Sequence, residues 1–350
     1  MRRIKVLHLI SGLGQGGAEK ILLDLSIKFN KQQDIESSII SFSNEISLLP
    51  EFEKNFIDVT VLYKRKSFLD LLKIIFEIIS YVKKRKIDII HAQMSHAMIV
   101  AAILKIRFPK LKVVFTPHSV NLGSRLRESI IFLLKPFREI DILFSEIMHQ
   151  WFNKHKYVVI PNGIRIEDFT VDVEKFDKFT FIAVGNIKEA KNYPFLIDCV
   201  DELRKNFDFQ LFIAGDGRNR ELLEKKIHSK NLEQHVFLMG HQHNIPELLN
   251  QSHCLVVASL WEGMPIAILE AGASSLPIIS TPVGSIPSVL DDTCAYLSSL
   301  DDFQYNMANV IQNYAEAKAR AERFNEKVKV NYTIEKMANS LEKLYKNLVR

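Results

Sequence analysis

Two glutamates, Glu262 and Glu270, are the side chains of this sequence with the plainest chemical use. Carboxylates accept hydrogen bonds, so a pair of them suits the hydroxyl groups of a sugar. Pro265 can begin a helix, which places Glu262 in the preceding loop and Glu270 within the helix. In a continuous helix their spacing would span about 12 Å, enough to touch two parts of one extended ligand. Glu262 could instead be a solvated loop charge, whereas Glu270 lies among apolar residues, where an unpartnered carboxylate is costly.

A lysine in another strand-to-helix loop offers the opposite charge. Lys191 follows the strand-like stretch Phe179–Val184 and Gly185, and Pro194 can begin the next helix. A cation beside a helix N-terminus, at the carboxyl end of a strand, suits a diphosphate. Taken alone, a loop lysine such as Lys191 would more often be solvent-exposed.

A glycine-rich loop follows the first strand-like stretch, and Gly12, Gly14 and Gly17 satisfy the pattern G-x-G-x-x-G. Bare backbone N–H groups before a helix favour a phosphate. A dinucleotide site also requires an acidic residue at the end of the second strand. The sequence there is Ser-Phe-Ser-Asn at 41–44, without a carboxylate. The dinucleotide interpretation is therefore weak, and a loop that serves only tight packing stays open.

The histidines do not predict a metal site. His91 and His96 are five residues apart, and the pair His241 and His243 lacks a nearby third ligand. The chain contains no D-x-D triplet, a pattern of two aspartates that could hold a metal ion. We therefore expect neither a catalytic metal nor a cofactor. His118, in Thr-Pro-His-Ser after a strand, is by itself a loop histidine of unknown role.

The elements that must position these residues alternate regularly between strands and helices, which predicts parallel sheets covered by helices. In the first half the expected strands are Ile4–Ile10, Ser37–Phe42, Val59–Leu62, Ile87–His91, Val113–Thr116 and Tyr157–Ile160. The expected helices there include Glu19–Asn30, Phe68–Lys84 and Met94–Arg107.

The same alternation restarts after Pro161-Asn162-Gly163. Expected strands are Phe179–Val184, Gln210–Ala214, Val236–Met239, His253–Ala258 and Pro277–Thr281; expected helices are Pro194–Asn206, Arg218–Ser229, Ile245–Gln251 and Pro265–Ser275. The tail from Asp302 is helical and ends in one apolar stripe. We predict an α/β protein with two Rossmann-like domains, residues 1–165 and 166–325, and a closing helix over 326–350. Ligands should bind at the carboxyl ends of the strands, in a cleft between the domains.

Composition limits the class of protein. The chain has 350 residues, 47% of them hydrophobic, and a net charge of +5, which excludes disordered, collagen-like and disulfide-stapled proteins. The charge is uneven: residues 1–160 hold 25 Lys and Arg against 15 Asp and Glu, and residues 161–350 hold 21 against 26. A basic half suits an anionic partner or simple solubility. No basic-aromatic motif for nucleic acid is present, so no nucleic-acid partner is expected.

Five motifs occur together in sequence order over nearly the whole chain: Gly16-Gly17-Ala18-Glu19, Pro161-Asn162-Gly163-Ile164, Gly185 with Lys191, Ile213-Ala214-Gly215-Asp216-Gly217, and Glu262 with Glu270. In this combination the chain resembles family 4 of the nucleotide-sugar-dependent retaining glycosyltransferases, which have the GT-B fold. The resemblance implies an N-terminal domain that binds the acceptor and a C-terminal domain that binds the sugar nucleotide. It also implies that the last helix crosses back onto the N-terminal domain.

The resemblance also implies roles for single residues. Glu270 would bind the ribose, Glu262 with the backbone of Gly263, Met264 and Pro265 would hold the donor sugar, and Lys191 would neutralise the leaving diphosphate. Gly16 and Gly17 would approach the phosphates and sugar, and His118 matches the family's active-site histidine. Two positions depart from the family: Asn186 stands where an arginine is common, and Ser288 where a glutamate is common. Asn186 belongs to the expected donor site. This site therefore has one fewer cation facing the phosphates than is common in the family.

The implied reaction is transfer of a sugar from a nucleotide diphosphate sugar to a hydroxyl, with front-face retention. The expected acceptor is a lipid-linked glycan in bacterial surface polysaccharide synthesis, such as lipopolysaccharide or capsule. The segment Ser124–Arg138 mixes basic and apolar residues, as helices on anionic lipid do. Phe68–Lys84, flanked by Lys64-Arg65-Lys66, favours a core helix with solvated ends. We expect a cytoplasmic enzyme, peripheral on the inner face of the cell membrane. Alternatives are a nucleotide-sugar epimerase of the same fold and an NAD-dependent oxidoreductase.

Overall fold

A computed structural model describes residues 2–62 and 68–350, and the chain in it forms two compact α/β units. Unit 1 comprises Met1–Gly163 with Ile334–Arg350, and unit 2 comprises Ile164–Thr333. The expected borders at 165/166 and 325/326 therefore fall at 163/164 and 333/334 in the structure. The chain enters and leaves unit 2 side by side, because the N–H of Ile164 donates to the carbonyl of Tyr332 at 2.9 Å.

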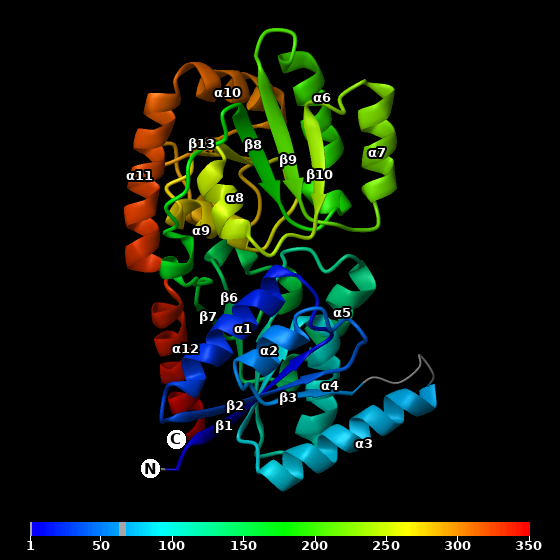
Figure 1. The fold of residues 1–350 in the computed structure, drawn as a ribbon. Helices are drawn as coiled ribbons and strands as arrows, with labels where there is room; N and C mark the ends of the chain where they lie inside the picture. The colour runs from blue at the N-terminus through cyan, green and yellow to red at the C-terminus, as the bar shows by residue number, and fades with distance from the viewer. Residues whose placement is uncertain (1, 63–67) are drawn as a thin grey trace. The chain divides into compact units, whose positions relative to one another are not determined.

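Unit 1 is built on a seven-stranded parallel sheet (Figure 1). Its strands are β1 (Ile4–Ile10), β2 (Ile35–Ser41), β3 (Val59–Val61), β4 (Ile89–Gln93), β5 (Lys112–Thr116), β6 (Ile140–Leu143) and β7 (Tyr157–Val159), in the order β3-β2-β1-β4-β5-β6-β7. The central strands β1 and β4 are almost wholly buried, as expected for a sheet covered on both faces. Strand β6 was not predicted from the sequence.

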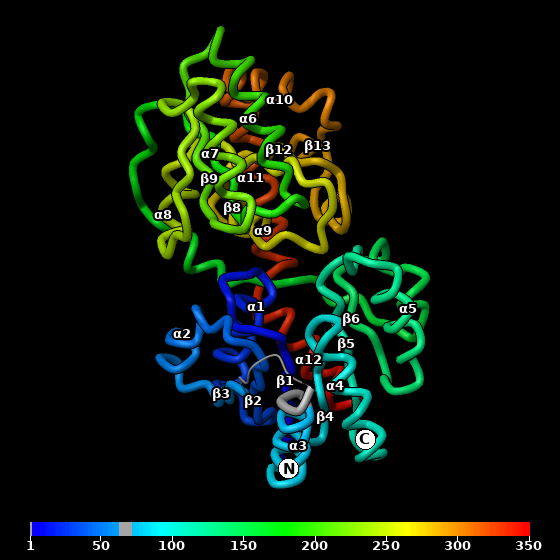
Figure 2. Tube along the Cα trace, turned by 90° about the vertical axis from the view of Figure 1, so that its right-hand side faces the viewer, coloured from blue at the N-terminus to red at the C-terminus, as the bar shows by residue number. Residues whose placement is uncertain are grey.

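The helices of unit 1 are α1 (Gly17–Asn30), α2 (Leu49–Lys54), α3 (Phe68–Arg85), α4 (Met94–Arg107), α5 (Arg125–Leu133) and α12 (Ile334–Val349). The last of these, α12, packs against α1 although the two are far apart in sequence (Figures 1 and 2). Its Tyr345 is fully buried, and the Tyr345 hydroxyl lies 2.7 Å from Nδ1 of His91 on β4. Lys28 on α1 pairs with Glu335 at 3.2 Å. The final helix is therefore an integral part of unit 1.

Unit 2 repeats the architecture with six parallel strands. They are β8 (Phe179–Val184), β9 (Phe209–Ala214), β10 (Val236–Gly240), β11 (Cys254–Val257), β12 (Ile278–Ser280) and β13 (Tyr296–Leu297), in the order β10-β9-β8-β11-β12-β13. Its helices are α6 (Tyr193–Leu203), α7 (Arg220–Ser229), α8 (Ile245–Gln251), α9 (Ile266–Ala273), α10 (Leu300–Gln312) and α11 (Tyr314–Asn331). The two-residue strand β13 was also missed by the sequence prediction.

Each sheet has one point where the strand order reverses. In unit 1 the chain runs from β1 outward to β3 and then returns to β4 on the other side of β1; in unit 2 the same reversal separates β8 from β11. The loops that leave the two strands of such a pair diverge, and the crevice they leave is where open α/β sheets bind ligands. The expected fold class, two Rossmann-like domains, is confirmed. Among the described residues, no helix is both long and apolar enough to cross a membrane.

Candidate active site

The switch point of unit 2 brings together two of the predicted site residues. The loop after β8 carries Lys191, and the loop after β11 carries Glu262. Nζ of Lys191 lies 2.7 Å from Oε1 of Glu262, and the Ser259 hydroxyl donates to the same oxygen at 2.8 Å. The side chains are only 20% and 14% exposed, respectively. A partly buried, hydrogen-bonded pair of this kind is held in place far better than a surface pair.

Backbone contacts fix the lysine loop. The Tyr193 hydroxyl donates to the carbonyl of Gly185 at 2.9 Å, and the N–H of Leu260 donates to the carbonyl of Ala190 at 2.8 Å, which ties the two loops together. Gly215, at the end of β9, has a φ of +155°, and a Cβ there would lie 2.1 Å from the Gly185 carbonyl oxygen. Only glycine permits that approach. Asn186 follows Gly185 in this loop and is half-buried.

A second glycine supports the glutamate loop. Gly284 has a φ of +57°, and a Cβ on it would lie 2.1 Å from the carbonyl oxygen of Glu262. The next residue, Ser285, donates its N–H to the carbonyl of Gly263 at 2.8 Å. The loop that follows β12 therefore packs against the backbone of Glu262–Pro265 and fixes its position. Met264 is buried, and Pro265 is the capping residue just before α9 rather than its first helical residue as expected.

Glu270 lies on α9 and is 4% exposed. All eight residues of the helix are buried, and Gly272 faces Phe324 of α11 so closely that a Cβ would lie 2.5 Å from the ring. The tight contact between α9 and α11 sets the depth at which the helix lies. Lys191, Glu262 and Glu270 thus all come from elements that begin at the carboxyl edge of one sheet.

Two carboxylates lie against the glycine loop of unit 1: Glu19, which belongs to the motif Gly16-Gly17-Ala18-Glu19, and Glu45, which was not singled out in the sequence. A Cβ on Gly16 would lie 2.3 Å from Oε2 of Glu19, and a Cβ on Gly14 would lie 3.3 Å from Oε2 of Glu45. The N–H of Leu13 donates to the carbonyl of Glu45 at 2.6 Å. Strand β2 ends at Ser41 with no carboxylate over 41–44, and Glu45 follows in the next loop. With acids on both sides, the loop and Gly17 suit hydroxyl groups better than phosphates.

His118 follows β5 and has a φ of +57°, a left-handed conformation that non-glycine residues rarely adopt. Its Nε2 lies 2.6 Å from Oε1 of Gln93, the last residue of β4. Burial lowers the pKa of His118 to about 4, so the ring is neutral near pH 7. Gln93 was missed in the sequence because the expected strand Ile87–His91 ended two residues before it, whereas β4 continues to Gln93.

His91, by contrast, has structural partners. His91 is held between the hydroxyls of Tyr345 and Thr116, at 2.7 and 2.8 Å. Within residues 2–62 and 68–350, no three His, Cys, Asp or Glu side chains are grouped so that they could hold a metal ion.

An apolar patch with basic neighbours covers α5 and the short helix Trp151–Asn153. Leu126 and Leu133 are 71% and 70% exposed, and the Phe132 and Trp151 rings lie 5.9 Å apart. Nζ of Lys135 lies 3.8 Å above the Phe132 ring. By contrast, α3 buries one face in the core of unit 1 through residues such as Ile74, Ile78 and Val82. The basic stretch 64–66 lies outside the described residues.

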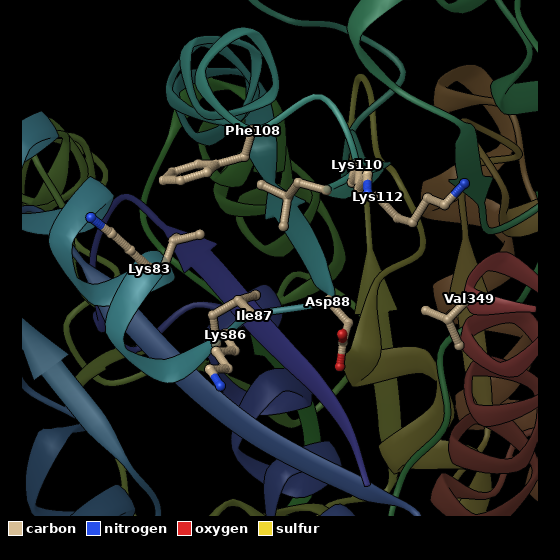
Figure 3. A pocket seen from close by; sticks show the side chains of 10 residues that line it. Lys83, Lys86, Ile87, Asp88, Phe108, Lys110, Lys112 and Val349 are labelled. Carbon is tan, nitrogen blue, oxygen red and sulfur yellow. The ribbon is translucent and has the colours of Figure 1, made fainter. Parts of the chain in front are cut away.

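A recess of about 430 Å³ lies at the opposite, amino-terminal edge of the unit 1 sheet (Figure 3). Its floor is apolar, with Ile87 and Leu111, and its rim is basic. Lys83, Lys86 and Lys112 extend in different directions in Figure 3, so they do not converge on one point. Basic residues are expected where helices such as α3 and α4 end. The recess includes none of the predicted site residues.

Comparison with known proteins identifies the family. Residues 15–168 match the family Glycosyltransferase Family 4, and residues 165–329 match Glycosyl transferases group 1. Together with the two switch-point sheets, these matches define a nucleotide-sugar glycosyltransferase of the GT-B fold. The chain belongs to the family 4 glycosyltransferases.

Several relatives span the chain. The UDP-Gal:α-D-GlcNAc-diphosphoundecaprenol α-1,3-galactosyltransferase of Escherichia coli is 26% identical over 99% of this chain and 98% of its own. The capsular polysaccharide biosynthesis glycosyltransferase CapH of Staphylococcus aureus is 24% identical over 80% of this chain and 82% of its own. HepE of Anabaena, solved in complex with UDP and glucose, superposes with a TM-score of 0.87 at 16% identity, over 99% of this chain and all of its own. The epimerase and oxidoreductase alternatives find no support among these proteins.

Proposed function

We propose that this enzyme transfers a hexose from a nucleoside diphosphate hexose to a hydroxyl of a lipid-linked glycan, with retention, during bacterial surface polysaccharide synthesis. The observation that carries the proposal is the Lys191–Glu262 pair at the switch point of unit 2. One cation and one carboxylate, 2.7 Å apart and fixed by their loops, match the two halves of such a donor: a diphosphate and a sugar rich in hydroxyls.

Each predicted residue has a role in this proposal. Lys191 takes up the negative charge that develops on the diphosphate when the bond to the sugar breaks. Glu262 and the backbone at 263–265 hold the sugar hydroxyls, the N–H groups at the start of α9 face the phosphates, and Glu270 binds the ribose. Asn186 donates a hydrogen bond to the phosphates where a cation is more common. His118, Gly16 and Gly17 contact the donor sugar.

Retention follows from a simple sequence of bond changes. The bond between the anomeric carbon and the β-phosphate oxygen breaks, and the acceptor oxygen bonds to the same face of the sugar. The acceptor's proton passes to the leaving phosphate, so no enzyme nucleophile or metal is needed. The E. coli relative supports this proposal, since its name specifies an α-linked product from UDP-Gal, whose galactose is itself α-linked.

Transfer assays test the function. The full-length protein is incubated with UDP-hexoses and with a GlcNAc-diphosphate carrying a short prenyl chain, the acceptor class named for the E. coli relative. We expect release of UDP, an α-linked product by NMR, and an unchanged rate in EDTA. If the protein bound none of the UDP-hexoses and formed no product, the proposal would be overturned. A β-linked product would overturn retention.

The acceptor end of the proposal depends on the exposed patch of α5. We place this patch against the anionic membrane surface, because exposed leucines, a tryptophan and nearby lysines are what interfacial segments present to lipid. Leu126→Glu with Leu133→Glu should abolish binding to vesicles rich in anionic phospholipid at low salt. Leu222→Glu, at an exposed leucine of α7 in unit 2, is the matched control. Equal binding by both variants would exclude the patch as the membrane contact.

A further inference from the structure

A chain of buried polar side chains leads from the centre of the unit 1 sheet to His118. Oε1 of Gln93 lies 2.6 Å from Nε2 of His118, and Nε2 of Gln93 lies 3.3 Å from Nδ1 of His8. His8 is in the middle of β1, and Gln93 ends the adjacent strand β4; both are buried. His118 is thus connected to the most rigid part of its domain.

The two contacts of Gln93 indicate which atoms carry hydrogen. A separation of 2.6 Å is short for a contact between two nitrogens but suits a donor and an oxygen, so the Gln93 amide oxygen faces His118. An amide oxygen only accepts, so Nε2 of His118 must donate. In a neutral ring, the other nitrogen, Nδ1, then carries the lone pair. In the described part of the chain, Nδ1 of His118 has no hydrogen-bond partner.

Two further features support a fixed orientation. The left-handed backbone of His118 costs energy in a non-glycine residue, and such strain tends to persist at functional sites. The Phe144 ring packs edge-on against the imidazole, with ring centres 5.4 Å apart. Burial lowers the pKa of His118, so the ring stays neutral and keeps one accepting nitrogen at neutral pH.

We propose that Gln93 is a positioning residue that holds His118 in its Nε2–H tautomer and thereby presents Nδ1 as a hydrogen-bond acceptor to a hydroxyl of the transferred sugar. The sugar contact rests on the proposed function, whereas the tautomer does not. The amide discriminates between tautomers because its oxygen cannot bond to an unprotonated nitrogen. A sugar that lacks the hydroxyl facing Nδ1 should be transferred poorly, since it leaves that nitrogen unpaired.

The tautomer is measured directly in full-length protein labelled with ¹⁵N-histidine. Long-range ¹H–¹⁵N spectra distinguish protonated from unprotonated ring nitrogens, and His118→Gln assigns the signals. We expect a protonated Nε2 and an unprotonated Nδ1 in the unmodified protein. Gln93→Met, which keeps the length but removes the acceptor, should lose this preference. Gln93→Glu, studied at pH 8, should restore it because a carboxylate accepts from the same N–H.

Kinetics provide the second measurement. Loss of the positioning hydrogen bond in Gln93→Met should lower kcat/KM for the UDP-hexose about tenfold and leave UDP affinity unchanged, with recovery in Gln93→Glu. Gln33→Met, at an exposed glutamine of unit 1, is the matched control. An Nδ1–H tautomer in the unmodified protein, or an unaltered tautomer and rate in Gln93→Met, would overturn the proposal. Lack of turnover in the unmodified protein would instead overturn the proposed function and the sugar contact with it, whatever the tautomer.

Discussion

Replacing Lys191 by alanine should weaken binding of UDP far more than binding of uridine. Among the described residues, Lys191 has Glu262 as its side-chain partner, with Nζ 2.7 Å from Oε1, and the loop holds Nζ at the carboxyl edge of the sheet. A charge-assisted hydrogen bond of this kind contributes about 1.5–3 kcal/mol, which corresponds to a loss of UDP affinity of about 10- to 150-fold. Uridine carries no phosphate, so its affinity should change by a small factor.

The free protein also responds to this change. Without Lys191, the largely buried carboxylate of Glu262 keeps the Ser259 hydroxyl but loses its counter-charge, and the unfolding free energy should fall by about 1–3 kcal/mol. Adding Glu262→Gln removes the uncompensated charge. The double variant should therefore regain stability without regaining affinity for UDP, which separates the effect on folding from the effect on binding.

Isothermal titration calorimetry at constant salt measures both ligands, and Lys188→Ala is the matched control. Lys188 lies in the same loop and is exposed. We expect near-normal UDP affinity in this control. Equal losses for UDP and uridine in Lys191→Ala, or an equal loss of UDP affinity in Lys188→Ala, would refute a phosphate role for Lys191.

Three further predictions follow from contacts in the two units. Gly284→Ala should destabilise unit 2 by about 2 kcal/mol and weaken UDP-hexose binding, because the new methyl group meets the Glu262 carbonyl oxygen; thermal unfolding and calorimetry measure this. Gly272→Ala should cost about 1–3 kcal/mol through its collision with Phe324, as chemical denaturation would report. Burial lowers the pKa of His8 to about 3. Below pH 6.5 the unfolded chain therefore binds a proton that the folded protein does not bind, and the free energy of unfolding decreases as the pH decreases. In His8→Gln, the slope of this decrease in unfolding free energy should be smaller by about 1.4 kcal/mol per pH unit between pH 6 and 4, as measured by denaturation.

Controls make these three predictions specific. Unit 1 contains Trp151 and unit 2 contains Trp261, so Trp261→Phe leaves a fluorescence reporter of unit 1 alone for the His8 measurement. If the unfolding free energy depended on pH equally in His8→Gln and in the unmodified protein, the lowered pKa of His8 would be excluded. A fully stable Gly284→Ala or Gly272→Ala variant would mean that the neighbouring segment moves aside without cost.

The sequence predicted the repeated strand–helix architecture because nearly every strand is a short, continuous apolar run, as buried parallel strands are. It missed β6 because that short strand carries Asp141 and is preceded by Arg138 and Glu139, and charges are not expected inside a sheet. In the structure Arg138 and Asp141 form a fully buried ion pair at 2.6 Å, which neutralises both. It missed β13 because two residues carry no periodicity.

The candidate site was also predicted from the sequence only in part. Lys191 and Glu262 could be named from loop position and charge, but their contact depends on which strands are neighbours, and that order is a property of the whole sheet. Glu45 follows β2 by four residues, and its approach to the glycine loop depends on the fold of the intervening loop rather than on a local pattern. The left-handed backbone of His118 and its bond to Gln93 require tertiary contacts that no local pattern encodes.

The central claim is that the diphosphate of the donor binds at the carboxyl edge of the unit 2 sheet, where β8 and β11 diverge. A crystal structure of the full-length protein with UDP tests it most directly. The account predicts phosphate oxygens within hydrogen-bond distance of Nζ of Lys191 and ribose hydroxyls at the carboxylate of Glu270. A diphosphate bound instead on the Gly12–Gly17 loop of unit 1, with Lys191 still paired only to Glu262, would contradict it.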